Sequence, residues 1–357
     1  MCGSAGRCRM CSSVDPRRTG NRLLAAGVAT ALVGCARPAG TLFPAMERPY
    51  VWPPPPDPPR IELVGMLSSS ADLKPARSSA EVLRAAFRGP RPPIPFSAPL
   101  DVAVDASRWV AVADGSARAV HLLDLQTRDH TLVSGFGKER FGTPTGVCWA
   151  DGRLFVTDAK RAEVIELDRT GRFVRSFGKG ALNRPVGIDW DPVRERLYVV
   201  DGGGHRIMVY TPRGQETGRI GHRGSEPGTF NFPTHVAVFD GRIAVADSGN
   251  FRVQILEPSG EVIRTIGHKG DAAGDFSLPK GVAFDRDGHL YVVDAHFENV
   301  QVFDEAGRLL LAFGEEGRGP GRFSLPAGLT FDDQDRLWVA DSGNRRLQVF
   351  RYRGTGP

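Results

Sequence analysis

Short stretches of alternating apolar and polar residues recur along residues 99–350, and glycine, proline, aspartate and asparagine separate them. One section of the chain shows four in succession: GVAFD, LYVVD, NVQVFD and RLLLAFG. An alternation with a period of two, bounded by turn residues, predicts short β-strands rather than helices. The pattern therefore predicts an all-β protein in which strands come in groups of four.

Three anchors repeat in step with these groups. The first is an aspartate that ends an apolar strand: Asp114, Asp158, Asp201, Asp247, Asp294 and Asp341. The second is a proline that leads into a strand: Pro99, Pro144, Pro185, Pro233, Pro279 and Pro326. The third is an apolar residue followed by glycine, which occurs five times from Phe136-Gly137 to Phe313-Gly314. Intervals of 41 to 48 residues between anchors indicate six repeats, and four short antiparallel strands per repeat are typical of a propeller blade.

Two of the repeats nearly coincide in sequence. VADSGNFRVQIL (245–256) and VADSGNRRLQVF (339–350) resemble the NHL repeat, and the resemblance covers roughly residues 99–350. It implies a six-bladed β-propeller.

The sixth repeat lacks a fourth strand, because the chain ends in RYRGTGP soon after its third. An open sheet edge favours aggregation. The segment RIELVG (60–65) has the alternation and the closing glycine of the fourth strands elsewhere. We therefore predict that this amino-terminal strand closes the ring in blade six, and that a short helix near residues 78–87, with Ser78 and Glu81 at capping-box spacing, follows it.

The first 34 residues have the features of an export signal. RRTGNR precedes the apolar run LLAAGVATALVGC, which is too short to span a bilayer. LVGC (32–35) resembles the bacterial lipobox, which implies cleavage before Cys35 and acylation of that cysteine. A plain signal peptide is the alternative, and Met10 is a second candidate start.

The segment that follows Cys35 is rich in proline, which cannot enter the interior of a sheet or helix. We interpret 35–59 as a lipidated tether of extended chain, with a proline-rich ligand for a partner groove as the alternative. The predicted organisation is a signal peptide at 1–34, the tether at 35–59, the closing strand and short helix at 60–98, and the propeller at 99–357. These features predict a bacterial envelope protein that is lipid-anchored and outer-membrane or periplasm-facing; the residue after Cys35 is not Asp, which favours outer-membrane sorting.

Removal of the signal changes the charge of the chain. Residues 1–34 carry five arginines and one aspartate, so the net charge falls from +5 to about +1. A near-neutral exported chain is not expected to bind nucleic acid, although some NHL propellers do. Cys148 would then be the one cysteine left beside Cys35, which excludes an internal disulfide and makes a small buried hydrophobe its expected role.

The repeated aspartates occur in every blade, so we expect them to bond the backbone rather than to catalyse. The aromatic residues Trp149, Trp190, Phe284 and Phe331 share one strand position and predict packing between blades.

Candidate site residues lie where the repeats differ. Four blades have glycine at the third position of the inner strand, whereas blade one has Asp101 and blade four has His235. These two blades lie opposite each other in a six-membered ring, so the two side chains are expected to face one another across the channel. The predicted ligand-binding face also contains residues from the loops between the second and third strands and one next to a retained glycine: Lys280, His205, Arg206, Arg252, His296 and Arg346.

The leading functional hypothesis is a monomeric, membrane-anchored scaffold that binds an envelope protein or another extracytoplasmic ligand. The alternative is a metal-dependent lyase or lactonase-like enzyme with a channel site, since relatives of this repeat include such lyases. His205, His235 and His296 come from successive blades but from different strand positions, and no metal motif of the family matches. We therefore assign no catalytic residue, metal or cofactor.

Overall fold

The computed structural model describes residues 40–74, 83, 86–89 and 92–353, and the chain divides into two compact units. The larger unit comprises residues 40–75 and 93–357, and the smaller unit comprises residues 1–39 and 76–92. In the smaller unit, residues 83 and 86–88 are helical, while most of the predicted helix and the whole predicted signal lie outside the described residues. No helix among the described residues is long and apolar enough to cross a bilayer.

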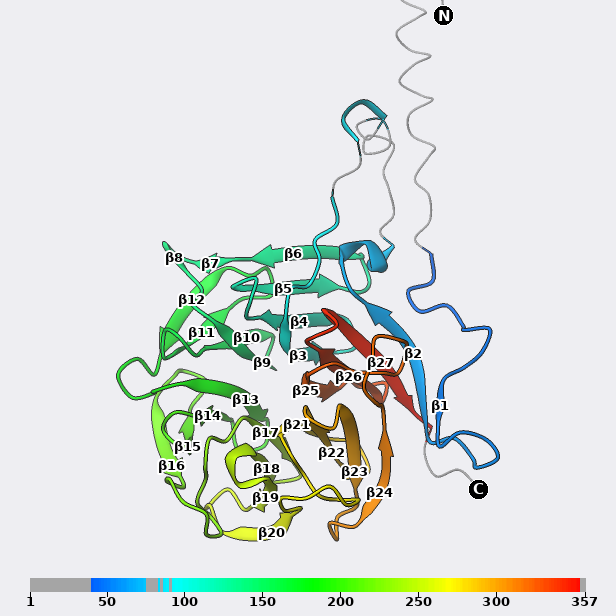
Figure 1. Cartoon of the computed structure of the whole chain (residues 1–357). Helices are drawn as coiled ribbons and strands as arrows, with labels where there is room; N and C mark the ends of the chain where they lie inside the picture. The colour runs from blue at the N-terminus through cyan, green and yellow to red at the C-terminus, as the bar shows by residue number, and fades with distance from the viewer. Residues whose placement is uncertain (1–39, 75–82, 84–85, 90–91, 354–357) are drawn as a thin grey trace, which may run out of the picture. The chain divides into compact units, whose positions relative to one another are not determined.

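The larger unit is a six-bladed β-propeller, as predicted (Figure 1). Each blade is an antiparallel sheet in which the first strand lies innermost. Blade one contains β3 (Pro99–Asp105), β4 (Trp109–Asp114), β5 (Ala119–Asp124) and β6 (Asp129–Val133), and blade two contains β9 (Pro144–Ala150), β10 (Arg153–Asp158), β11 (Glu163–Leu167) and β12 (Phe173–Phe177). Blade three contains β13 (Pro185–Asp191), β14 (Arg196–Asp201), β15 (Arg206–Tyr210) and β16 (Glu216–Ile220), and blade four contains β17 (His235–Phe239), β18 (Arg242–Asp247), β19 (Arg252–Leu256) and β20 (Val262–Ile266).

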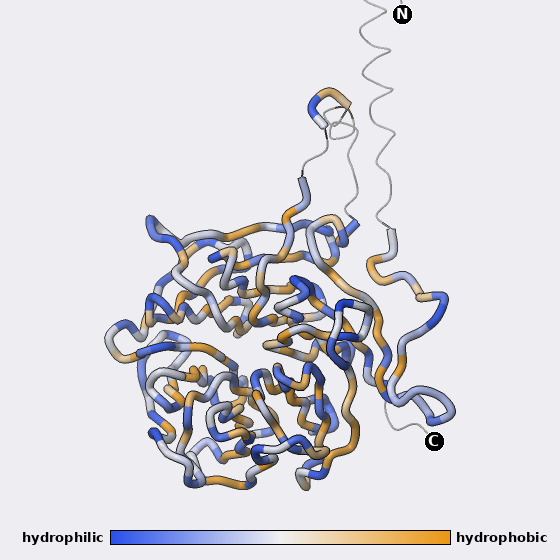
Figure 2. Tube along the Cα trace, viewed as in Figure 1, coloured by the Kyte–Doolittle hydropathy of each residue, from blue (hydrophilic) through white to orange (hydrophobic). Residues whose placement is uncertain are grey.

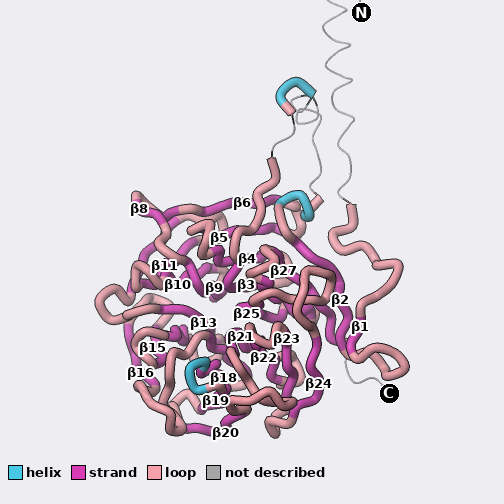
Figure 3. The backbone as a smooth tube through the Cα atoms, in the orientation of Figure 1, coloured by secondary structure: helices cyan, strands magenta, loops and turns pink. Residues whose placement is uncertain are grey.

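Blade five contains β21 (Pro279–Phe284), β22 (Leu290–Asp294), β23 (Asn299–Phe303) and β24 (Leu309–Phe313). The carboxyl-terminal strands of blade six are β25 (Pro326–Phe331), β26 (Arg336–Asp341) and β27 (Arg346–Tyr352). Two-residue strands β7 (Gly135–Phe136) and β8 (Glu139–Arg140) form a small hairpin, and two short 3₁₀ turns cover Ser70–Leu73 and Ser248–Asn250. Figure 3 shows that strands account for most of the ordered ring and that loops join them at its two ends.

The amino-terminal strand β2 (Ile61–Leu67) closes the ring. It pairs antiparallel with β27 from Ile61↔Tyr352 to Leu67↔Leu347, and Figure 1 shows the blue strand beside the red one. The predicted closure of blade six by residues 60–65 is confirmed, and the strand extends two residues further than that segment.

Part of the segment assigned to the tether packs on blade six instead of standing free. β1 (Val51–Trp52) adds a fifth strand at the edge of this sheet, where neighbouring prolines are tolerated. The ring of Trp52 lies 5.8 Å from that of Phe313, and the ring of Phe43 lies 6.0 Å from that of Trp338. The chain is therefore attached to the propeller from about residue 42 onward, which shortens the predicted tether.

Six apolar clusters hold the ring together, one at each junction between neighbouring blades. Figure 2 shows the apolar positions alternating with polar ones along the strands. The clusters that flank blade six include Ile61, Leu63 and Leu67 of β2. Trp149, Trp190, Phe284 and Phe331 pack against four of the clusters, which confirms their predicted place between blades.

The repeated aspartates serve the backbone of their own blades. All six are fully buried. In blade one, the carboxylate of Asp114 accepts hydrogen bonds from the N–H groups of Ser97, Ala98 and Ala117. The same bonds recur in blade five, where Asp294 accepts from Ser277, Leu278 and the loop that follows it. The structural role expected for these residues is confirmed, and each aspartate fixes the loop that precedes the inner strand.

Candidate functional site

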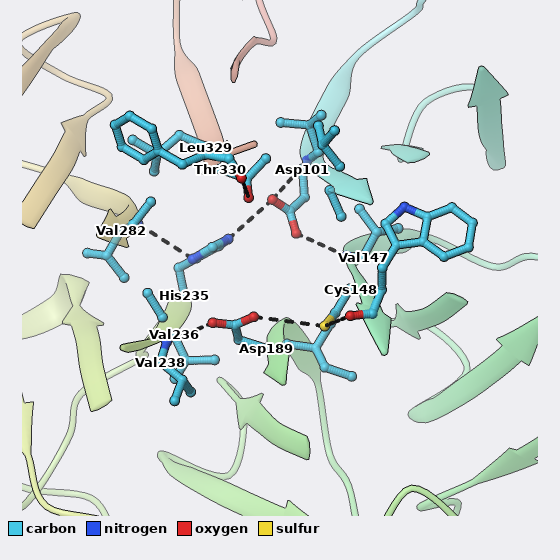
Figure 4. A pocket seen from close by; sticks show the side chains of 18 of the residues that line it. Asp101, Val147, Cys148, Asp189, His235, Val236, Val238, Val282, Leu329 and Thr330 are labelled. Atoms are coloured by element: carbon cyan, nitrogen blue, oxygen red, sulfur yellow. Dashed lines mark hydrogen bonds and ion pairs between the residues drawn. The ribbon is translucent and has the colours of Figure 1, made fainter. Parts of the chain in front are cut away.

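The central channel contains a cavity of about 230 Å³ between the six inner strands. Residues at the third to sixth positions of these strands line it, so it extends from Asp101 and His235 toward the hairpins that join the first and second strands. Figure 4 shows Asp101, His235, Asp189 and Cys148 converging in this space from four different blades.

Glycine at the third strand position explains why the cavity ends there. The inner strands approach so closely that a Cβ atom on Gly187 would lie 2.7 Å from the Cα atom of His235, and the N–H of Gly187 bonds the carbonyl of Thr234 in the next blade. A Cβ atom on Gly328 would collide with Asp101. Larger residues are accommodated in blades one and four because their neighbours are glycine.

Asp101 and His235 meet across the channel, as the sequence analysis expected. Nε2 of His235 lies 3.2 Å from Oδ1 of Asp101. The same carboxylate accepts hydrogen bonds from the N–H groups of Val102 and of Val147 in blade two, both at 2.9 Å. Nδ1 of His235 accepts a long hydrogen bond, 3.5 Å, from the N–H of Val282 in blade five. When the imidazole is neutral, its proton therefore lies on Nε2 and is donated to Asp101.

The sequence analysis did not single out Asp189, the second carboxylate of the cavity. Its oxygens accept hydrogen bonds from the N–H groups of Trp190 at 2.8 Å and of Val238 in blade four at 2.7 Å. The thiol of Cys148 lies 3.8 Å from Oδ1 of Asp189. The signal was present in the sequence, since position five of the inner strand is small or weakly polar in the other blades and aspartate in this one.

Burial and mutual charge shift the pKa values of these groups. Burial raises the pKa of Asp189 to about 6, against the opposing effect of its two backbone hydrogen bonds. Burial lowers the pKa of His235, but the carboxylates of Asp101 and Asp189 outweigh it and leave that pKa above its usual value. Burial and the same two carboxylates raise the pKa of the Cys148 thiol, which makes this cysteine a poor nucleophile at neutral pH.

Three arginines predicted for the ligand-binding face are structural. Arg206, Arg252 and Arg346 form ion pairs with the repeated aspartates at 3.2, 2.9 and 2.7 Å. The remaining donors of Arg346 bond backbone carbonyls of the preceding loop. Each arginine begins the third strand of its blade, and its guanidinium lies against the aspartate of that blade, which corrects the expectation that these side chains face a ligand.

The histidines of the loops do not join His235. His205 is buried, its Nδ1 accepts the N–H of Phe232 at 3.1 Å, and its ring packs on that phenylalanine at 4.4 Å. His296 is exposed beside Phe297. In the described part of the chain, the one group of three close metal-ligand side chains is Asp285, Asp287 and His289, in the β21–β22 hairpin. The set of three loop and channel histidines considered for a metal is therefore not assembled.

Lys280 lies beyond the glycine constriction, at the end of the channel that faces the loops. Burial and the positive charge of Arg184 lower the pKa of its amine. Lys280 and Arg184 flank the prolines of blades five and three, so they lie on the face that the second-to-third-strand loops share.

The same face presents exposed apolar side chains on three successive blades. Phe232, Leu278 and Leu325 directly precede the inner-strand prolines of blades four, five and six and are 51%, 36% and 58% exposed. The N–H of Phe232 donates to His205, and the N–H of Leu325 donates to Oε1 of Glu298. Loops of the preceding blades therefore hold two of the three apolar residues in place.

Family models and solved structures agree with this architecture. The model of the NHL repeat matches residues 230–256 and 323–350, which cover the first three strands of blades four and six. The chain is a six-bladed β-propeller that contains NHL repeats. No curated protein matches the chain.

Solved structures similar to the NHL propeller have different functions. A streptogramin B lyase is 14% identical with a TM-score of 0.55, over 72% of this chain and 95% of that one. A chain of a nidogen/laminin complex is 20% identical with a TM-score of 0.54, over 70% and 88%. An auxiliary nutrient binding protein from Bacteroides thetaiotaomicron is 14% identical with a TM-score of 0.58, over 72% and 69%. At these identities the likeness establishes the fold alone.

Proposed function

We propose that this NHL propeller is a non-enzymatic, membrane-tethered scaffold of the bacterial envelope that binds a protein partner through the loop face of blades four to six. The observation that carries the proposal is the row of exposed apolar residues Phe232, Leu278 and Leu325 at one position of three successive blades. Apolar groups gathered on one face of a protein are typical of an interaction site.

The charge next to the inner-strand prolines indicates the chemistry of the partner, while the longer loops that lead into these prolines also place the exposed Glu226, Asp271, Glu315 and Glu316 at this end. Among the loops between second and third strands and the residues flanking the inner-strand prolines, the acidic residue is Glu298, whose carboxylate already bonds the N–H of Leu325. Lys160, Arg184, Lys280 and Arg345 lie at these positions and form no ion pair with another described residue. A segment that combines apolar with acidic side chains would complement both features.

The membrane tether rests on the sequence of residues 1–35. A basic flank, a short apolar run and LVGC support export and acylation at Cys35, and several acyl chains hold a protein firmly at a bilayer. The intact mass of the protein extracted from membranes tests this part directly, because an unmodified Cys35 or an uncleaved chain would contradict it.

Binding of a defined peptide tests the proposed face. A synthetic peptide that alternates leucine with aspartate is expected to bind the propeller at least tenfold more tightly than the same peptide with lysine in place of aspartate, as measured by fluorescence anisotropy. The preference should decrease with added salt, since exposed charges are screened. Equal affinity for both peptides, or preference for the basic one, would contradict an acidic partner.

One observation supports the enzyme alternative, and another argues against its metal-dependent form. The Asp101–His235 pair in a cavity is an arrangement that acid–base catalysis can use. The metal-dependent form is not supported, because His205 is buried elsewhere and His296 is exposed. We therefore retain the scaffold as the proposed function.

A further inference from the structure

The channel cavity contains more negative than positive charge. Asp101 is paired with His235, whereas Asp189 has no cationic side chain within ion-pair distance among the described residues. Its partners are the backbone N–H groups of Trp190 and Val238 and the neutral thiol of Cys148. If the imidazole is charged, the group of three ionisable side chains carries a net charge of about −1, and if it is neutral the charge is more negative.

Asp189 remains reachable from the cavity although protein surrounds it. Asp189 as a residue is partly exposed, whereas Asp101 is 2% exposed. The accessible part faces the cavity, which Asp189 lines (Figure 4). Oδ1 accepts the N–H of Trp190 and the thiol of Cys148, whereas Oδ2 accepts only the N–H of Val238 and retains a second acceptor site. A ligand in the cavity could therefore bond this carboxylate without displacing any protein donor.

The rest of the wall combines polar groups with apolar and aromatic side chains. One valine, isoleucine or leucine from the inner strand of each blade borders the cavity but is largely buried between blades, and Trp149, Phe284 and Phe331 line the end away from the Asp101–His235 pair. The indole N–H of Trp149 is buried and has no hydrogen-bond partner. Faces of aromatic rings attract organic cations.

A metal ion fits this site less well than an organic cation. The ligand atoms of Asp101, Asp189 and His235 do not come together as a group, whereas those of Asp285, Asp287 and His289 do. Nε2 of His235 is also engaged by Asp101. The aromatic end formed by Trp149, Phe284 and Phe331 suits a ligand with a hydrocarbon part, which a hydrated metal ion lacks.

We propose that the channel cavity binds a small organic ammonium ion, with the ammonium group on Asp189 and the hydrocarbon part toward the aromatic end. This site is separate from the proposed protein-binding face, since the glycine constriction lies between them. The size of the cavity limits the ligand: an engineered cavity of ~150 Å³ holds benzene, so one of about 230 Å³ holds a ring with a short side chain.

Three probes of the same shape test the proposal: benzylamine, benzyl alcohol and benzoate. Calorimetric titration of the propeller is expected to give the order benzylamine, then benzyl alcohol, then benzoate, with at least a tenfold preference for the amine over the alcohol. Affinity for the amine should fall between pH 7 and pH 5, because Asp189 becomes protonated over that range while the amine stays charged.

The variant Asp189→Asn should lose at least tenfold in affinity for benzylamine and keep its affinity for the alcohol. Asp240→Asn, at an exposed position in the β17–β18 hairpin, is the matched control and should bind as the unmodified chain does. If Asp189→Asn fails to fold, the comparison of amine with alcohol and its pH dependence still decides. No binding of the amine, equal binding of the alcohol, or an affinity that does not change with pH would overturn the proposal.

Discussion

At the scale of single residues, one strand position determines the interior of the channel. Glycine at the third position lets neighbouring inner strands meet, and a side chain fits there only where the adjoining blade has glycine. Asp101 and His235 occupy the two exceptions and bond each other. Each also accepts a backbone N–H from the next blade, so the pair both lines the cavity and connects blades.

The Asp101–His235 pair is expected to make the free energy of unfolding depend on pH. The pKa of His235 is higher in the folded chain than in the unfolded chain, where it is ~6.5, because Asp101 and Asp189 favour the charged imidazole despite its burial. The stabilisation is therefore fully present below about pH 6.5 and is lost as the pH rises through the folded value. Urea unfolding should show that His235→Gln lowers the free energy of unfolding more at pH 5.5 than at pH 9.

Asp101→Asn provides the control for this measurement. It removes the carboxylate that pairs with the imidazole, so a further His235→Gln change in that background should have a much weaker pH dependence. A cost of His235→Gln that is the same at both pH values would show that the imidazole gains no charge stabilisation in the channel. Asp189 also titrates nearby, which is why the comparison is made between variants at each pH.

At the scale of elements, the alternation of apolar and polar residues predicts the strands, but it does not predict how the segment before β2 packs. RIELVG was identified as the missing strand because its alternation and glycine match those of the other fourth strands. The packing of residues 42–52 was not predicted, because proline content alone says nothing about where Phe43 and Trp52 can bury their rings. Those places exist because Gly65 and Gly321 leave the space that the two rings occupy.

Truncation separates the contributions of β1 and β2. A fragment that begins at residue 69 lacks β2 and should lose much of its resistance to thermal unfolding, because β27 then becomes an open edge and two apolar clusters lose Ile61, Leu63 and Leu67. A fragment that begins at residue 60 lacks only β1 and the packed segment before it, and its midpoint should fall by a few degrees. Equal midpoints for the two fragments would contradict closure by β2.

At the scale of the whole molecule, sequence predicted the ring but only part of its sites. Equivalence of the blades alone predicts that Asp101 lies opposite His235. The same comparison of blades predicts that Arg206, Arg252 and Arg346 face a ligand. The guanidinium of each instead pairs with the aspartate of its own blade, which the position of the arginine in the sequence does not reveal. The sequence does not single out Asp189, because the residues that surround its carboxylate in the cavity, such as Cys148 and Val238, are far from it in the sequence.

The ring also gives the molecule two different ends. One end has the second-to-third-strand loops, the apolar residues before the prolines and unpaired basic side chains. The other end has the first-to-second-strand hairpins, toward which the cavity extends. Val193, 83% exposed in the β13–β14 hairpin, lies at this second end and is an apolar reference for the first.

The measurement that tests the account most directly is the affinity of the leucine–aspartate peptide for three variants of the propeller. Phe232→Ser and Leu325→Ser should each weaken binding about tenfold, since each removes a contact worth ~1.5 kcal/mol or more, and Val193→Ser should leave the affinity within about twofold. Unchanged affinity in the first two variants, or an equal loss in Val193→Ser, would contradict the proposal that blades four to six form the binding face.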